Sequence, residues 1–202
     1  MTHRVGIFLY DEVEVLDFSG PFEVFSTASR VKHNFQPDVE PPFEVITLAA
    51  SLEPVQARGG LTILPQASLA NHAHLDILII PGGAFTPELE RPDIIDWVKR
   101  SAADAKITAS VCTGAFLLAR AGLLHGKPAT THWEDIPALH AFPGIDVVAN
   151  RRWVDTGRLI TSAGIAAGID MCLHIVARLE GIELAQRTAR QMEYEWQLVE
   201  DS

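Results

Sequence analysis

A short apolar segment that passes directly into a helix pattern constrains this chain more than any other feature of its sequence. Residues 107–111 (ITASV) are apolar or β-branched, which predicts a strand buried on both faces. Residues 115–124 place apolar side chains at helical spacing, with Gly122 as a suitable stop. Only Cys112-Thr113-Gly114 separates the two patterns. The chain must therefore turn sharply at Cys112, as it does at a nucleophile elbow.

The position of Cys112 suggests chemistry. At a helix N-terminus the unpaired backbone N–H groups and the helix dipole favour a thiolate, so we expect a lowered pKa there. The alternative is a small core residue, because free cysteines are often buried. Cys172 lies among apolar residues in the middle of a predicted helix, and we expect it to be core.

Length and composition predict an ordinary α/β domain. The 202 residues are 48% hydrophobic and 21% charged, and a net charge of −10 argues against binding to a nucleic-acid backbone. Two cysteines provide no disulfide framework, which favours a reducing compartment. The sequence begins almost directly with a predicted strand, and its apolar runs are too short to span a membrane. We therefore expect a cytoplasmic protein without membrane contact.

Strand and helix patterns alternate along the chain, which predicts one domain with a mostly parallel sheet covered on both faces. We expect the first helix to open at Ser19–Pro21, after a connection over residues 11–17. The predicted strands are residues 5–10, 43–48, 61–64, 76–81, 107–111, 146–149, 152–155 and 159–161. The other predicted helices are residues 87–104, 115–124, 134–140, 165–179 and 182–198.

Several polar or flexible positions follow strands and should meet at the carboxyl edge of this sheet, where ligands bind in open α/β folds. They are Asp17, Gly82-Gly83, Cys112-Thr113 and Gly164-Ile165. Backbone N–H groups near Gly83 and Thr113 could form a pocket like an oxyanion hole. A carboxyl group beside a thiolate is pushed toward its protonated form, so Asp17 could donate a proton. The alternative for Asp17 is a solvated loop charge or a partner of the helix dipole.

Cofactor and metal motifs are absent from the sequence. The segment from Gly122 to Pro128 lacks the spacing and the hydroxyl residue of a phosphate-binding loop, and no dinucleotide fingerprint is present. His72 and His74 form a pair without a third ligand, which is more typical of a surface loop than of a metal site. We expect neither a metal nor an organic cofactor.

Four segments carry a resemblance to a known family: LDFSGPFEVF, IIPGGAF, SVCTGAFLLARAGLLHGKPATTHW and TSAGIAAGID. They resemble the ThiJ/PfpI group of the class I glutamine amidotransferase-like superfamily. The resemblance implies a flavodoxin-like three-layer sandwich with a cysteine nucleophile elbow, a single ThiJ/PfpI-like domain over residues 1–202, and a homodimer. His132 and Trp133 belong to the shared TTHW segment, and we expect both to pack, because nothing in the sequence directs either side chain toward Cys112.

The sequence resembles the hydratase branch of this family at two positions. Asp17 stands where most relatives carry glutamate, and Thr113 directly follows the cysteine. That resemblance implies a small-molecule substrate, an isonitrile, which gains water to become an N-substituted formamide. Cys112 would attack as the nucleophile and Asp17 would transfer protons. Thr113 would position substrate or water, and Gly83 would polarise the reacting group, with Gly82, Gly164 and Ile165 lining the site.

Two other functions remain open. Related motifs open the sensor domains of transcription regulators, so the domain could bind a small molecule or sense redox state without catalysis. The chain could also be a hydrolase or a glyoxalase-type enzyme of the family. Such members tend to have histidine after the cysteine, and Thr113 is discordant with that chemistry.

Overall fold

The computed structural model describes residues 1–196 of the chain. Within this range no helix is long and apolar enough to cross a membrane. The strands are β1 (His3–Phe8), β2 (Phe43–Ala49), β3 (Val55–Gln56), β4 (Thr62–Ile63), β5 (Ala67–Ser68), β6 (Ile77–Ile80), β7 (Ile107–Ser110), β8 (Pro128–Ala129), β9 (Asp146–Val147), β10 (Trp153–Asp155) and β11 (Leu159–Ser162). The α-helices are α1 (Val15–Phe35), α2 (Thr86–Leu89), α3 (Pro92–Asp104), α4 (Ala115–Arg120), α5 (Ile136–Leu139), α6 (Ala167–Glu180) and α7 (Ile182–Gln191). Three 3₁₀ turns are η1 (Arg58–Gly60), η2 (Cys112–Gly114) and η3 (Trp133–Asp135).

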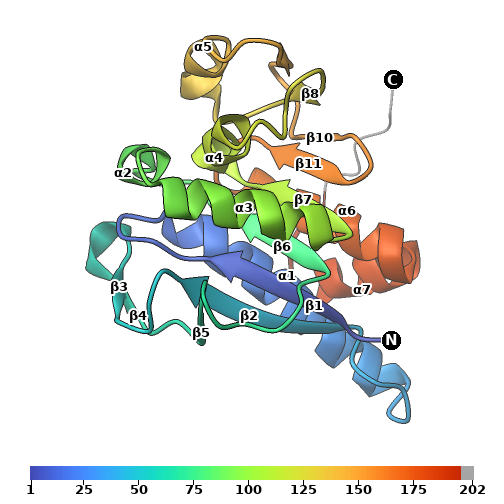
Figure 1. Cartoon of the computed structure of the whole chain (residues 1–202). Helices are drawn as coiled ribbons and strands as arrows, with labels where there is room; N and C mark the ends of the chain where they lie inside the picture. Colours follow the sequence, from blue (N-terminus) through green and yellow to red (C-terminus); the bar gives the residue numbers. More distant parts are fainter. Residues whose placement is uncertain (197–202) are drawn as a thin grey trace.

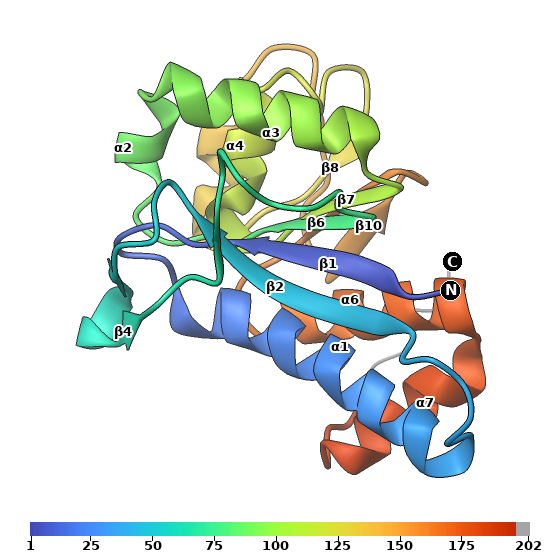
Figure 2. The same ribbon diagram turned by 60° about the horizontal axis from the view of Figure 1, so that its bottom comes forward.

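The central sheet has seven strands in the order β10-β11-β7-β6-β1-β2-β5. All neighbouring strands are parallel except β10 and β11, which are antiparallel. Helices α1 and α6 cover one face, with α7 packed against both, and α2, α3 and α4 lie on the other face (Figures 1 and 2). The predicted α/β three-layer sandwich is confirmed.

The middle of the sheet is apolar on both faces because helices exclude water from each side. All four residues of β6 are fully buried, as are Val5 and Ile7 of β1. The neighbouring strand β7 is also buried along its length. These strands match the predicted segments, since short runs of β-branched and aliphatic residues are a strong signal for a doubly covered sheet.

Helix α1 begins earlier than predicted. It starts at Val15, so Asp17 lies in its first turn and the predicted connection over residues 11–17 is wrong at its end. Ser19 is not the N-cap, because its hydroxyl donates to the carbonyl oxygen of Val15 at 2.7 Å. The helix start is held by tertiary contacts instead: the N–H of Glu14 donates to the carbonyl of Gly82 at 2.9 Å.

Other predicted helices are interrupted or shorter. The segment 87–104 forms two helices, α2 and α3, because Arg91 is extended before Pro92. Helix α4 ends at Arg120, ahead of Gly122 with a φ of +74°. Helix α7 ends at Gln191, and the predicted end of that helix at residue 198 lies outside the described residues.

The junction between β7 and α4 is pressed against the neighbouring strand. A Cβ atom at Gly114 would lie 2.1 Å from the carbonyl oxygen of Ile80, the last residue of β6. No side chain fits there, because the obstacle is backbone and cannot rotate away. Gly114 therefore allows the elbow to sit directly on the end of β6.

Replacing Gly114 with alanine should lower the free energy of unfolding by about 3 kcal/mol or more, because the new methyl group forces β6 and the elbow apart. The matched control is Gly122→Ala, where the φ of +74° costs about 1–2 kcal/mol but nothing lies within 4 Å. Urea unfolding of both variants measures the difference. Equal losses in the two variants would contradict this account of the junction.

Candidate active site

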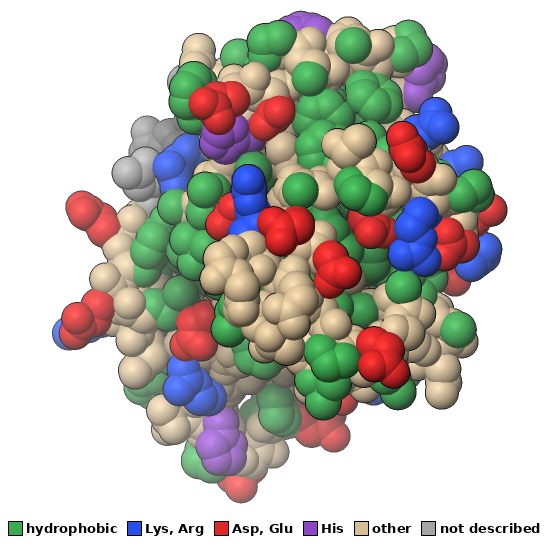
Figure 3. Space-filling model, turned by 90° about the vertical axis from the view of Figure 1, so that its left-hand side faces the viewer, with side chains coloured by type: hydrophobic (Ala, Val, Ile, Leu, Met, Phe, Trp, Pro, Cys, Tyr) green, Lys and Arg blue, Asp and Glu red, His purple; other side chains and the backbone are tan. Residues whose placement is uncertain are grey.

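The predicted site residues meet at the topological switch point of the sheet, where the chain connections lead away in opposite directions. Strands β1 and β6 are neighbours, but β1 leads to β2 on one side whereas β6 leads to β7 on the other. Ligands bind at such switch points, outside the carboxyl ends of the strands. Asp17 follows β1, Gly82-Gly83 follows β6 and Cys112 follows β7. Figure 3 views the molecule from this side, where charged side chains of both signs cross a partly hydrophobic face.

Cys112 has the strained backbone that the sequence predicts for an elbow. Its φ is +55°, a region that residues with a Cβ atom rarely adopt. Two hydrogen bonds fix this conformation: its N–H donates to Ala163 at 3.2 Å, and the Thr131 hydroxyl donates to its carbonyl at 2.8 Å. The side chain is nearly buried, with 7% of the residue exposed.

Asp17 is fully buried beside this cysteine. One carboxyl oxygen, Oδ2, accepts a hydrogen bond from the N–H of Gly82 at 3.0 Å. The other, Oδ1, has no hydrogen-bond partner within residues 1–196. Burial raises the pKa of Asp17 to about 7, and the charge of Glu14 adds to the rise, while the Gly82 N–H and the nearby Cys112 thiol oppose it. The carboxyl group can therefore take up or release a proton near neutral pH.

The backbone N–H groups of Gly82 and Gly83, which follow β6, hold the side chains of Asp17 and Thr113 in place. The hydroxyl of Thr113 accepts from the N–H of Gly83 at 3.0 Å and lies 3.1 Å from its carbonyl oxygen. A Cβ atom at Gly82 would lie 2.6 Å from the Thr113 hydroxyl and 2.8 Å from Asp17 Oδ2. Both amides are thus already engaged, Gly82 with Asp17 and Gly83 with Thr113. They position these side chains here, and the predicted role of Gly83 in polarising a substrate stays a prediction.

Ile165 approaches the sulfur from the loop between β11 and α6, whereas Gly164, just before it in the same loop, lies against the ring of His132. Burial raises the pKa of the Cys112 thiol to about 12, and the charge of Asp17 adds to this effect. Hydrogen bonds from the backbone N–H groups of Thr113 and Ile165 act in the opposite direction but are weaker. The lowered pKa expected from the helix N-terminus is therefore corrected: loss of hydration outweighs the dipole.

Three side chains near the site were not assigned to it from the sequence. Glu14 and Arg58 influence the charge of Asp17. The ring of His132 lies against Gly164, where a Cβ atom would be 2.1 Å from its Cδ2, so His132 packs as expected. Trp133 does not, because it is 74% exposed. The sequence signals for these contacts are weak, since Arg58 and His132 reach the site from remote segments.

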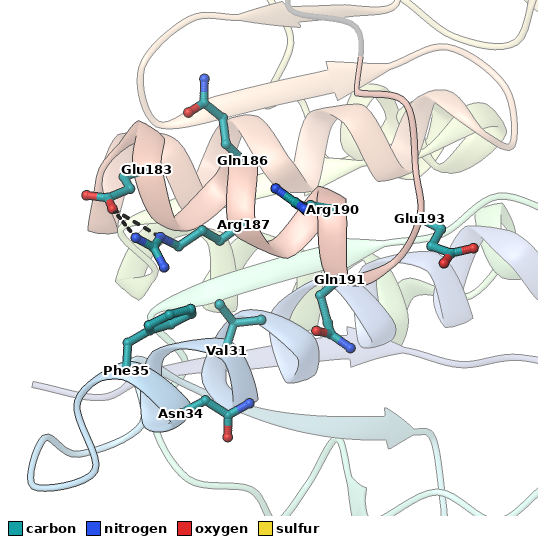
Figure 4. A pocket seen from close by; sticks show the side chains of 9 residues that line it. All are labelled: Val31, Asn34, Phe35, Glu183, Gln186, Arg187, Arg190, Gln191 and Glu193. Atoms are coloured by element: carbon teal, nitrogen blue, oxygen red, sulfur yellow. Dashed lines mark hydrogen bonds and ion pairs between the residues drawn. The ribbon is translucent and has the colours of Figure 1, made fainter.

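A surface groove lies away from this chemistry. A groove of about 720 Å³ runs between α7 and the end of α1 (Figure 4). Val31 lines this groove, whereas Asp17 is fourteen positions earlier on the same helix, or about 21 Å along its axis. Within residues 1–196, no group of three or more potential ligand side chains could hold a metal ion.

The two cysteines should differ in reactivity. Cys112 is slightly exposed beside a proton-accepting carboxyl group, whereas Cys172 is fully buried in α6 and its pKa is raised by burial. We expect iodoacetamide to label Cys112 roughly tenfold faster or more in the native protein. Peptide mapping by mass spectrometry measures both sites, and urea-unfolded protein is the control in which both react. Equal native labelling would contradict the assignment.

Comparisons with known proteins agree with this fold. A model of the DJ-1/PfpI family matches residues 3–178. Isonitrile hydratase of Pseudomonas putida is 36% identical over 198 residues, covering 96% of this chain and 79% of that protein. The HTH-type transcriptional regulator GbdR of Pseudomonas aeruginosa is 33% identical over 150 residues, covering 74% of this chain and 41% of the regulator.

Solved structures with the same fold extend over the whole chain. A ThiJ/PfpI family protein from Pseudomonas syringae superposes with a TM-score of 0.85 at 28% identity, covering 100% of this chain and 78% of that one. Drosophila melanogaster DJ-1beta has a TM-score of 0.82 at 23% identity, covering 97% of this chain and 100% of its own, and shows the fold alone. The chain belongs to the DJ-1/PfpI family.

Proposed function

We propose that this protein adds water to an isonitrile to give an N-substituted formamide. The observation that carries the proposal is the buried pairing of the elbow cysteine, Cys112, with the carboxyl group of Asp17. Isonitrile hydratase of Pseudomonas putida, at 36% identity, supports the choice of reaction. The protein would act on a small molecule, as a cytoplasmic homodimer with one domain over residues 1–202, without a metal, an organic cofactor or nucleic acid.

The pair carries one proton over a wide pH range. With pKa values of about 7 for Asp17 and about 12 for Cys112, a single proton is shared between these pH values. This state contains either a thiol beside a carboxylate or a thiolate beside a carboxylic acid. Transfer of one proton connects the two forms, so the buried site carries one negative charge in both. A thiolate can therefore form without a second buried charge.

In the first half of the reaction, the thiol proton passes to Asp17 while the sulfur bonds to the terminal isonitrile carbon. Asp17 then delivers that proton to the same carbon, which gives a covalent thioimidate, S–CH=N–R. The Gly82 N–H holds Asp17 Oδ2, so Oδ1 is left to carry the proton. The hydrogen bonds from Thr113 and Ile165 N–H groups stabilise the sulfur whenever it is anionic.

In the second half, water bonds to the thioimidate carbon. Asp17 accepts a proton from this water and delivers it to nitrogen. The carbon–sulfur bond then breaks as the remaining hydroxyl proton returns to sulfur by way of Asp17. The products are the free thiol and H–CO–NH–R. The role of Thr113 is to tie the elbow to Gly83, which keeps Asp17 and Cys112 in register.

A sensor function is the second candidate, because the match to the regulator GbdR covers 74% of this chain. In that case Cys112 and Asp17 would bind a ligand or respond to oxidation without turnover. The hydrolase and glyoxalase-type alternatives are less well supported, because Thr113 follows the cysteine and its hydroxyl is occupied by Gly83. Formamide production distinguishes these possibilities.

Wild-type protein should produce formamide from members of a panel of alkyl and aryl isonitriles, measured by chromatography. Asp17→Asn retains the size of the side chain but not the transferable proton, so turnover should fall about 10²–10⁴-fold. Cys112→Ala should abolish turnover. Cys172→Ala is the matched control and should retain it, with circular dichroism confirming that each variant folds. No formamide from any isonitrile would refute the proposal and favour a sensor.

A further inference from the structure

The hairpin that carries Arg58 is clamped onto the segment just ahead of Asp17. The N–H of Glu12 donates to the carbonyl of Gln56 at 2.7 Å, and the N–H of Gln56 donates to Asp11 Oδ1 at 2.9 Å. The N–H of Arg58 donates to the carbonyl of Val13 at 3.0 Å. The place of Arg58 is thus fixed by its backbone, whatever its side chain does.

The side chain of Arg58 forms an ion pair that adjoins the proposed active site. Its Nη1 lies 3.3 Å from Glu14 Oε2. Glu14 is linked twice to the proposed acid–base group: its N–H donates to the carbonyl of Gly82, whose own N–H donates to Asp17, and its carbonyl accepts from the N–H of Asp17 at 3.1 Å. Few covalent and hydrogen bonds therefore separate the ion pair from Asp17.

We propose that the Glu14–Arg58 ion pair adjusts the charge of Asp17, with Arg58 as the positioning residue that favours the carboxylate and Glu14 as the group that opposes it. The pair does not touch substrate in this proposal. It adjusts the pH at which the shared-proton state of the site forms. The inference deepens the proposed function and rests on it only for its catalytic readout.

The titratable groups that interact electrostatically with Asp17 come from four segments. Cys112 approaches from the elbow, Glu14 from the start of α1, Arg58 from the turn η1 and Tyr10 from the chain after β1. Arg58 lowers the pKa of Asp17, and Glu14 raises it. Tyr10 is neutral near pH 7, because burial raises its pKa well above the usual value. The ion pair therefore places one acidic and one basic side chain near this carboxyl group.

The sign of each substitution follows. Without the positive charge of Arg58, the pKa of Asp17 rises, so the carboxylate forms only at higher pH. Without the negative charge of Glu14, the pKa of Asp17 falls and the carboxylate persists to lower pH. The Arg58 side chain is 54% exposed and that of Glu14 is 24% exposed, so water and salt screen both effects. We expect shifts on the order of half a pH unit.

The direct test is a ¹³C NMR titration of protein labelled at its aspartate carboxyl carbons, with the Asp17 signal assigned by its loss in Asp17→Asn. Arg58→Gln should move the Asp17 titration to higher pH and Glu14→Gln to lower pH. Arg58→Lys keeps the charge and should restore most of the wild-type value. The matched control is Arg30→Gln, because Arg30 also lies in an exposed ion pair, 3.0 Å from Glu23 on α1. It should cause no shift.

The catalytic readout is the pH dependence of kcat/KM for formamide formation. Activity should rise with pH as Asp17 deprotonates, and at a fixed pH on this rising limb Arg58→Gln should be about threefold slower, which is half a pH unit expressed as a rate. In 1 M salt, where screening acts over about 3 Å, the variant and wild-type curves should converge.

The outcomes separate this inference from the proposed function. Opposite NMR shifts in the two glutamine variants support the inference even if no isonitrile is hydrated. An Asp17 titration that does not move in either variant, or that moves in the same direction in both, would overturn it even in an active enzyme. The inference would also be overturned if both variants lost activity while the pH at which kcat/KM rises stayed unchanged. The ion pair would then have a structural role only.

Discussion

The burial of Asp17 beside Cys112 is the constraint on which the rest of the site depends. Two negative charges cannot be held so close together out of water, so the pair keeps a proton over a broad pH range. Burial raises both pKa values, to about 7 and about 12. The result is a nucleophile that is protonated at rest and a neighbour that can take its proton when a substrate arrives.

The scaffold holds this pair through backbone rather than through side-chain ions. Gly82 donates to Asp17, Gly83 engages Thr113, and the elbow itself rests on β6 because residue 114 has no Cβ atom. Each of these contacts requires a close approach that a larger residue would block. The PGG turn after β6 therefore connects the two halves of the acid–base pair and fixes their separation.

Local signals predicted the sheet and the elbow, because a doubly buried strand and a strand-to-helix junction are both encoded in neighbouring residues. The start of α1 was mispredicted because no side-chain cap marks it, and the bond from Glu14 to Gly82 that fixes it is a tertiary contact. The predicted direction of the Cys112 pKa shift was wrong for a related reason. The helix N-terminus after Cys112 can be recognised in the sequence, whereas the loss of hydration depends on which residues pack over the sulfur. Arg58 was missed because it lies 44 positions from Glu14, in a turn between two strands of only two residues each.

The central claim is that Cys112 forms a covalent bond to the substrate carbon during turnover. Intact-protein and peptide mass spectrometry after rapid acid quenching tests it most directly. We predict an adduct equal to the full mass of the isonitrile, confined to the peptide that contains Cys112, which appears within the first turnover and disappears as formamide accumulates. Formamide production at an undiminished rate by Cys112→Ala, or turnover by wild-type protein with an adduct at another residue, would contradict the account.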